Sequence, residues 1–352
     1  MLKILRTWFN RYFSDPEAVL LLFILVIGFG LIIGFGQILA PVLASIVFAY
    51  LLEWMVVHLQ KWRIPRLAAV WITFLGFLGL FFLSFLLLLP LLWKQVVALT
   101  DDLPNMVQKA QQTLDKLVAY YPEFFTEEQI HSFSSTLLVN ARDVGKVVLS
   151  VSLSSLMSLI TWLVYLILVP LLVFFFLKDR PKILHWFKRF LPQKRTLLKQ
   201  VSSEVNGQIG NYIRGKVVEI IVVGVFTYLV FWYFDLRYGI LLAFLVGLSV
   251  LIPYVGAIVI TIPVMIVGYL QWGFISQFGY MVMAYLIVQG IDSNILVPLL
   301  FSEAVNLHPI AIIVAILFFG GIWGFWGVFF AIPLATLVKA VLYAWPKKEA
   351  TT

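Results

Sequence analysis

The sequence predicts an all-α fold, a polytopic membrane protein with about eight spans, some broken or re-entrant, and a helical insert outside the membrane. Three observations predict it. The 352 residues are 62% hydrophobic and 12% charged, with a mean hydropathy of +1.01, whereas soluble domains carry roughly 25% charged residues. The apolar runs reach the length of about 20 residues that crosses a bilayer. They are continuous rather than alternating, which favours helices over a barrel.

Residues 1–93 are predicted to hold the first three spans, at 18–35, 38–57 and 67–93. Lys3, Arg6 and Arg11 precede the first apolar run, as in a signal peptide. A cleavable signal ends after roughly 7–15 apolar residues, but here the apolar character continues into the second run. We therefore expect the first span to be retained.

Residues 94–150 are predicted to form an amphipathic helical insert on the extracytoplasmic side. Apolar residues recur there at steps of three and four, between 103 and 118 and again between 133 and 144. Asp101 and Asp102 precede Pro104 and are candidate caps for a helix that begins at this point. A packing spacer and a functional lid are both open interpretations of the insert.

A fourth span at 151–177 leads into a basic amphipathic segment at 178–216. Helices of this kind lie in the membrane interface, with the apolar side in the acyl chains and the basic side on anionic headgroups. Membrane lipids are therefore an expected partner of 178–216. A gate or coupling element is the alternative interpretation.

Residues 217–345 are predicted to hold the later spans, and helix breakers gather in them. Pro253, Tyr254 and Gly256 split the apolar run 239–270 into two halves that are each short for a crossing. The run is either one kinked helix or a re-entrant hairpin. Four glycines interrupt the last run and are either hinges or close-packing positions: Gly320, Gly321, Gly324 and Gly327.

The distribution of Lys and Arg predicts the orientation. They are frequent in the N-terminal arm, after the second span, in 178–216 and in the tail 346–352, and cytoplasmic loops carry such an excess. We expect both termini in the cytoplasm. The net charge of +8 is then a topology signal, and we expect no nucleic-acid partner.

The most polar stretch inside an apolar run holds Gln289, Asp292 and Asn294. An ionisable group at membrane depth is costly unless it faces water, an ion, a substrate or a partner. This segment is therefore predicted to line a path for a substrate or an ion. Glu53 and Glu219 lie at the borders of apolar runs and are expected at the interface.

The sequence contains no motif for catalysis, for a cofactor or for a metal site. The chain has no cysteine, which excludes thiol catalysis and thiolate metal sites, and it has no phosphate-binding loop or nucleophile motif. We predict no enzyme activity, no cofactor and no metal site. One possible secondary polar cluster holds Glu303, Asn306 and His308.

Several motifs, in this order, resemble the autoinducer-2 exporter family of membrane transporters, and within it the PerM-type permeases. The most specific is Gln-Gly-Ile-Asp-Ser-Asn at 289–294, continuing to Pro298. The others lie at 169–179, 211–216, 252–256, 307–309, 320–327 and 331–333. The resemblance implies a multi-pass transporter of the cell inner membrane, forming a homo-oligomer. It implies export of autoinducer-2, or exchange of sodium or lithium for protons.

The sequence-based hypothesis is an inner-membrane permease or exporter for a small polar solute, with autoinducer-2 as one candidate. Cargo crosses between the break at Pro253, Tyr254 and Gly256 and the polar segment, where Asp292 binds a cation, a proton or cargo hydroxyls. Gln289 and Asn294 orient the cargo. The alternatives are a cation/proton antiporter, an uncoupled facilitator and a membrane scaffold.

Overall fold

A computed structural model describes residues 16–120, 136, 156–189, 196–253, 255–301 and 307–345. All elements within these ranges are helices, which confirms the all-α polytopic membrane protein. Seven helical segments in the described part of the chain are long and apolar enough to cross a membrane. A shorter apolar helix at Leu163–Lys178 is part of the predicted fourth span, whose beginning lies outside the described residues.

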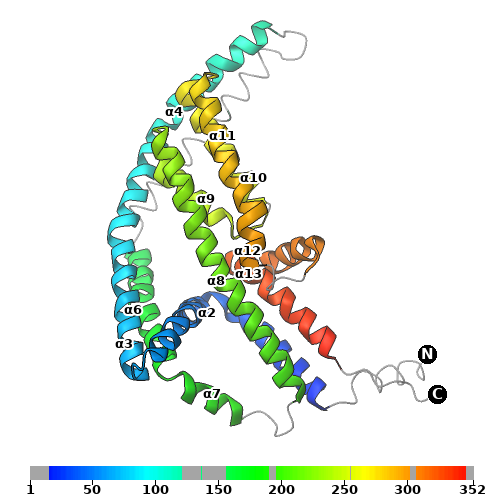
Figure 1. Cartoon of the computed structure of the whole chain (residues 1–352). Helices are drawn as coiled ribbons and strands as arrows, with labels where there is room; N and C mark the ends of the chain where they lie inside the picture. The colour runs from blue at the N-terminus through cyan, green and yellow to red at the C-terminus, as the bar shows by residue number, and fades with distance from the viewer. Residues whose placement is uncertain are drawn as a thin grey trace, which may run out of the picture. The chain divides into compact units, whose positions relative to one another are not determined.

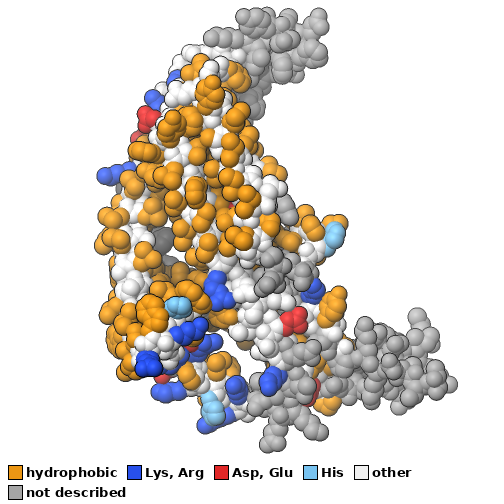
Figure 2. Space-filling model, viewed as in Figure 1, with side chains coloured by type: hydrophobic (Ala, Val, Ile, Leu, Met, Phe, Trp, Pro, Cys, Tyr) orange, Lys and Arg blue, Asp and Glu red, His pale blue; other side chains and the backbone are white. Residues whose placement is uncertain are grey.

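Large apolar side chains cover the exposed surfaces of the helices. Examples on neighbouring turns are Ile258, Ile262 and Ile266, whose side chains are all exposed. Figure 2 shows hydrophobic side chains spread over the visible face, while Lys and Arg are fewer and most of them lie in the lower part of the view. A soluble protein rarely exposes such contiguous apolar surface, so these faces fit a lipid environment.

The helices form two compact units, each described by itself below. Unit 1 comprises Met1–Phe77, Leu166–Val218 and Ile295–Thr352, and unit 2 comprises Leu78–Tyr165 and Glu219–Asn294. The chain passes from one unit to the other inside continuous helices. The six consecutive segments that we predicted along the chain are not tested by this division and stay predictions.

Unit 1 contains the helices drawn in Figure 1 as α2 (Pro16–Lys61), the first part of α3 (Arg66–Leu83), most of α6 (Leu156–Lys178), α7 (Arg180–Arg189), the first part of α8 (Thr196–Tyr233), α12 (Val297–Phe301) and α13 (Pro309–Ala344). The first two predicted spans are the two limbs of α2, which meet at a non-helical Phe35 (φ −125°, ψ 16°). The basic segment 178–216 comprises α7 and the first half of α8.

Helix α13 reverses sharply at Gly324. This residue has φ 59° and ψ −135°, a backbone conformation that residues other than glycine rarely adopt. Past the turn, Gly327 lies directly against the carbonyl oxygen of Phe319, and a Cβ at Gly320 would lie 2.8 Å from the Val328 side chain. Gly321 has no such neighbour within 4 Å. Three of the four glycines therefore have a steric role, and a hinge motion stays a prediction.

A buried carboxylate joins four helices of unit 1. Glu53, near the end of α2, is 7% exposed. It accepts hydrogen bonds at 3.0 and 3.2 Å from both Nη atoms of Arg66, at the start of α3. Arg180 of α7 lies 2.7 Å from the same carboxylate, and Arg66 also donates to the Leu177 carbonyl at the end of α6. The expected interfacial acid is thus the centre of an ion-paired junction.

Unit 2 contains the π-turn η1 (Ser84–Leu88), α4 (Leu89–Tyr120), the second half of α8, α9 (Gly239–Ser249), α10 (Val255–Trp272) and α11 (Ser276–Ile291). Helix α4 continues through Pro104. The predicted helix start at Asp101 and Asp102 is therefore wrong. Pro104 removes one backbone hydrogen bond but does not end the helix. The second half of the insert lies outside the described residues.

Helices α9 and α10 form a hairpin. Gln271, at the end of α10, donates to the Asp235 carbonyl at 2.8 Å and accepts from the backbone N–H of Arg237 at 2.8 Å. Asp235 and Arg237 immediately precede α9, so the two outer ends of the hairpin lie together. With 11 residues, α9 is about 17 Å long, too short to cross alone. Of the two interpretations, the structure favours the re-entrant hairpin.

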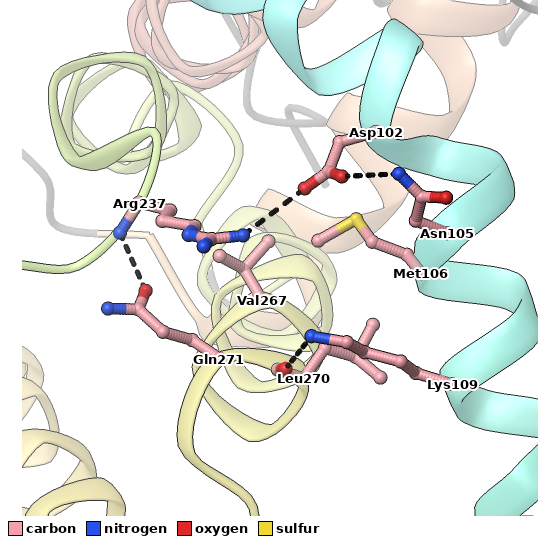
Figure 3. Close-up of a pocket in the computed structure, with 8 residues that line it drawn as sticks. All are labelled: Asp102, Asn105, Met106, Lys109, Arg237, Val267, Leu270 and Gln271. Atoms are coloured by element: carbon pink, nitrogen blue, oxygen red, sulfur yellow. Dashed lines mark hydrogen bonds and ion pairs between the residues drawn. The ribbon is translucent and has the colours of Figure 1, made fainter.

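The open end of the hairpin is fastened to α4 (Figure 3). Asp102 of α4 lies 3.5 Å from the Arg237 guanidinium and accepts a hydrogen bond of 3.0 Å from the Tyr238 hydroxyl. Lys109 donates to the Leu270 carbonyl at 3.5 Å. Partial burial, reinforced by the Asp102 carboxylate, raises the pKa of Tyr238 to about 12. The Tyr238 hydroxyl therefore keeps its proton, and with it the hydrogen bond to Asp102, to a higher pH than an ordinary tyrosine would.

Glu53→Gln is expected to destabilise the protein by about 2–3 kcal/mol, because two guanidinium groups lose their counter-charge. The measurement is heat unfolding of the purified protein in detergent. Asp179→Asn is the matched control, because its partner Lys182 is 83% exposed and a surface pair contributes less than about 1 kcal/mol. Equal losses of stability in the two variants would contradict the role of Glu53 as the centre of an ion-paired junction.

Gly256→Ala is expected to destabilise the protein by about 1–3 kcal/mol, because Gly256 lies directly against the carbonyl of Ser249 in the hairpin. Gly279 of α11 has no neighbour within 4 Å of an added Cβ. Gly279→Ala is therefore expected to be neutral or stabilising by up to about 1 kcal/mol. Unfolding midpoints of both variants test the opposite signs, and a stable Gly256→Ala protein would argue against the close packing.

Candidate functional site

The predicted polar segment lies where α11 changes into a π-turn, η2 (Asp292–Leu296). Such single π-turns within α-helices occur frequently at functional sites. Asp292 is the first residue of the turn and is only 8% exposed. Gln289 is half-buried, whereas Asn294 is exposed and donates to the Gly290 carbonyl of its own helix at 2.8 Å. Asp292 is thus the most buried of the three.

Within unit 2, a chain of hydrogen bonds runs from Gln289 of α11 to α10. The Gln289 Nε2 atom donates to the Tyr285 hydroxyl at 2.9 Å. The Tyr285 and Thr261 hydroxyls lie 2.8 Å apart, and Thr261 donates to the Ala257 carbonyl at 2.6 Å. This chain joins α10 and α11 through side chains in their apolar segments.

Sequence reasoning missed Tyr285 and Thr261. Tyr285 is fully buried, and its ring lies 5.9 Å from that of Phe231. A signal existed, because Tyr285, Gln289 and Asp292 are spaced by four and three residues and so share one face of a helix. The pairing of Tyr285 with Thr261 depends on contacts between helices, which the sequence alone does not reveal.

Helices α10 and α11 of unit 2 are antiparallel, since Gly268 packs against Met281 while Thr261 meets Tyr285. If this pairing were continued by two turns, Pro253 would lie level with Asp292. That the break and the polar segment line one path stays a prediction. Tyr254 lies outside the described residues.

The backbone of the break already makes its own hydrogen bonds. The carbonyls of Leu248, Ser249, Ile252 and Pro253 each accept one from a later backbone N–H, at 2.7 to 3.1 Å. The turn therefore supplies partners for these four carbonyls itself.

Two further charges are buried in α8. Glu219, which we expected at the interface, is only 2% exposed and ranks among the largest fully buried side chains. Lys216, one turn earlier and in unit 1, is 4% exposed, and its ammonium group lies 5.2 Å from the centre of the Phe301 ring. The middle of α8 therefore carries two charges inside the protein, and the interfacial level of Glu219 stays a prediction.

The secondary polar cluster is only partly described. His308 caps α13, because its Nδ1 accepts a hydrogen bond of 3.3 Å from the backbone N–H of Ile310, and Pro309 follows at the first helical position. This is a structural role. Glu303 and Asn306 lie outside the described residues.

A small polar pocket lies at the open end of the hairpin (Figure 3). Its cavity volume of about 20 Å³ is enough for roughly one water molecule. The lining includes Asp102, Asn105, Lys109, Arg237 and Gln271. Most of these groups hydrogen-bond to each other or to the backbone, so this pocket functions as a fastening between α4 and the hairpin rather than as a cargo site.

Comparison with known proteins identifies related chains. The family model described as AI-2E family transporter matches residues 19–347. The chain is 50% identical over 346 residues to the "Putative permease PerM" of Escherichia coli (strain K12), covering 98% of each protein. It is 24% identical over 335 residues to the "AI-2 transport protein TqsA" of the same strain, covering 93% of this chain and 91% of that one.

A more distant relative is the "Putative transport protein YueF" of Bacillus subtilis (strain 168), 26% identical over 300 residues, which covers 81% of this chain and 78% of the relative. The family match includes the hairpin and the polar segment around Asp292. The resemblance seen in the motifs is confirmed, and the chain belongs to the AI-2E family of transporters.

Proposed function

We propose that this protein is a permease that moves a small polar solute across the cytoplasmic membrane, and that Asp292 is its principal binding group. Membership of a transporter family and the seven membrane-length helices in the described part of the chain support the general class. One relative is named as a transport protein for AI-2, which makes autoinducer-2 the first cargo to test. The proposal includes no catalytic step.

The observation that carries the proposal is the environment of Asp292. A carboxylate within an apolar span is costly unless a partner, an ion or a cargo compensates it. Asp292 is buried at a π-turn, next to the hydrogen-bond chain of Gln289. Re-entrant and broken helices near the middle of a bilayer are a recurrent framework for binding substrates and ions.

A second candidate function is exchange of a cation for protons. Unit 2 buries two acids in its apolar helices, Glu219 and Asp292. Buried acids of this kind attract cations and can carry protons. An uncoupled facilitator uses the same site but responds to no gradient other than that of its cargo.

The proposed location is the cytoplasmic membrane with both termini in the cytoplasm. The basic residues of the N-terminal arm, of α7 and of the tail support this orientation. If the hairpin and the reversed α13 each return to the side on which they start, the eight predicted spans become about six crossings, again an even number. Anionic headgroups along α7 and a homo-oligomeric assembly complete the proposal.

Asp292→Asn is expected to lower transport at least about tenfold, the effect of losing one charged contact of roughly 1.4 kcal/mol or more. Purified protein in liposomes is assayed with autoinducer-2 and with sodium-22, each with and without a proton gradient. Asp179→Asn is the control, because it makes the same chemical change in the basic segment.

Unchanged flux of both probes by a folded Asp292→Asn protein would refute the role of Asp292. Sodium flux driven by the proton gradient would identify the antiporter. Autoinducer-2 flux that ignores both gradients would identify the facilitator. If the wild-type protein moves neither probe, autoinducer-2 and sodium are both excluded as cargo. Loss of cellular function on deleting 101–146, together with a harmless Asp292→Asn substitution, would then support the scaffold.

A further inference from the structure

We propose that Tyr285, held by Thr261, is a positioning residue that orients the side-chain amide of Gln289 so that its carbonyl oxygen is presented to the cargo. This inference rests on the proposed function of the same site. It concerns which atom of Gln289 the transport path offers, and the donor and acceptor pattern of three side chains supports it.

Counting protons fixes the direction of the chain. A hydroxyl group has one proton to donate, and that of Thr261 goes to the Ala257 carbonyl at 2.6 Å. In the contact of 2.8 Å between Thr261 and Tyr285, Tyr285 must therefore be the donor. The Tyr285 proton is then used, so the bond of 2.9 Å to Gln289 must be donated by the amide nitrogen.

The surroundings hold this arrangement in place. Tyr285 is fully buried, and its ring lies 5.9 Å from the ring of Phe231, which restricts movement of the phenol. Thr261 is anchored to the backbone of its own helix. Rotating the Gln289 amide by half a turn would set its oxygen against the Tyr285 oxygen, with no proton between them. The amide therefore has one favourable orientation.

This orientation gives the site two oxygen acceptors, the Gln289 carbonyl and the Asp292 carboxylate. Gln289 and Asp292 are three residues apart and lie on the same face of the chain, as far as α11 continues. The bond to Tyr285 uses one of the two N–H groups of the Gln289 amide and turns the carbonyl oxygen, on the other side of the amide, toward a ligand. A flipped amide would instead offer a donor beside the Asp292 carboxylate and would compete with the cargo for it.

The first experiment tests the orientation without any cargo. A 3-fluorotyrosine is placed at position 285 of the full chain by amber suppression, and its fluorine NMR resonance is recorded in nanodiscs. Thr261→Val and Gln289→Leu are expected to shift the resonance, because each removes one partner of the phenol. Thr261→Ser retains the hydroxyl and is expected to leave the resonance close to that of the parent.

The second experiment tests the positioning role with the same probes as above, autoinducer-2 and sodium-22. Tyr285→Phe and Thr261→Val are each expected to raise the apparent KM about five- to tenfold, as for the loss of one hydrogen bond, with little change in maximal rate. Thr261→Val keeps the Tyr285 hydroxyl but frees its proton to reach Gln289, so the amide can flip. Thr261→Ser is expected to restore the KM.

Matched controls separate orientation from packing. Tyr280→Phe makes the same change at a tyrosine of α11 that is 62% exposed. Thr227→Val makes the same change at a fully buried threonine of α8, whose hydroxyl has no hydrogen-bond partner among the described residues. Both controls are expected to leave the KM and the fluorine resonance unchanged, and Thr227→Val also to preserve or raise stability.

The outcomes are distinguishable. A fluorine resonance that ignores Thr261→Val and Gln289→Leu overturns the hydrogen-bond chain itself. Shifts in the resonance with an unchanged KM in folded Tyr285→Phe and Thr261→Val proteins reduce the chain to a helix-packing contact and overturn the positioning role. Absence of flux by the wild-type protein refutes the proposed function, and the positioning role falls with it, while the resonance still reports the orientation.

Discussion

A helix that stops halfway through an apolar layer must return, and its backbone must find hydrogen-bond partners inside the protein. The hairpin of α9 and α10 meets this constraint in two places. At its closed end, the carbonyls of Leu248, Ser249, Ile252 and Pro253 accept hydrogen bonds from backbone N–H groups of the same turn. At its open end, Gln271 bridges the backbone on either side of Leu236. These hydrogen bonds at its two ends determine where the hairpin turns, and so determine the position of the break in the proposed site.

The polar groups of unit 2 depend on the hairpin for their arrangement. Helix α10 carries Thr261 to the face of α11 on which Tyr285 and Gln289 lie, and Gly256 allows the first turn of α10 to approach α9 closely. A larger residue at Gly256 would move the helix that anchors the hydrogen-bond chain. Packing at the hairpin tip and polarity around Asp292 are therefore linked through α10, although Asp292 itself belongs to the next helix.

The sequence predicted the class well, because long apolar runs are local features. An acid inside one of them is equally local, but the role of the polar segment in transport stays a prediction. The hairpin could not be separated from a kink, since α9 and α10 have the same apolar composition in either geometry. Tyr285 was overlooked because a tyrosine in an apolar run usually packs as an aromatic ring. Asp102 was assigned to a helix start because Pro104 follows it closely, whereas α4 continues through that proline. Its contacts with Arg237 and Tyr238, like the burial of Glu219 in α8, depend on packing between helices that the sequence alone does not reveal.

The division of the chain into units has a consequence for biosynthesis. Leu21, near the start of the chain, shares a buried cluster with Ala340 and Val341, near its end. Unit 2, in contrast, has all of its residues by Asn294. During translation the helix that carries Leu21 therefore waits in the bilayer until Ala340 and Val341 have been synthesised, whereas unit 2 is free to assemble earlier. A truncated product that ends shortly after α11 would leave the N-terminal helices without their partners, exposed to quality-control proteases.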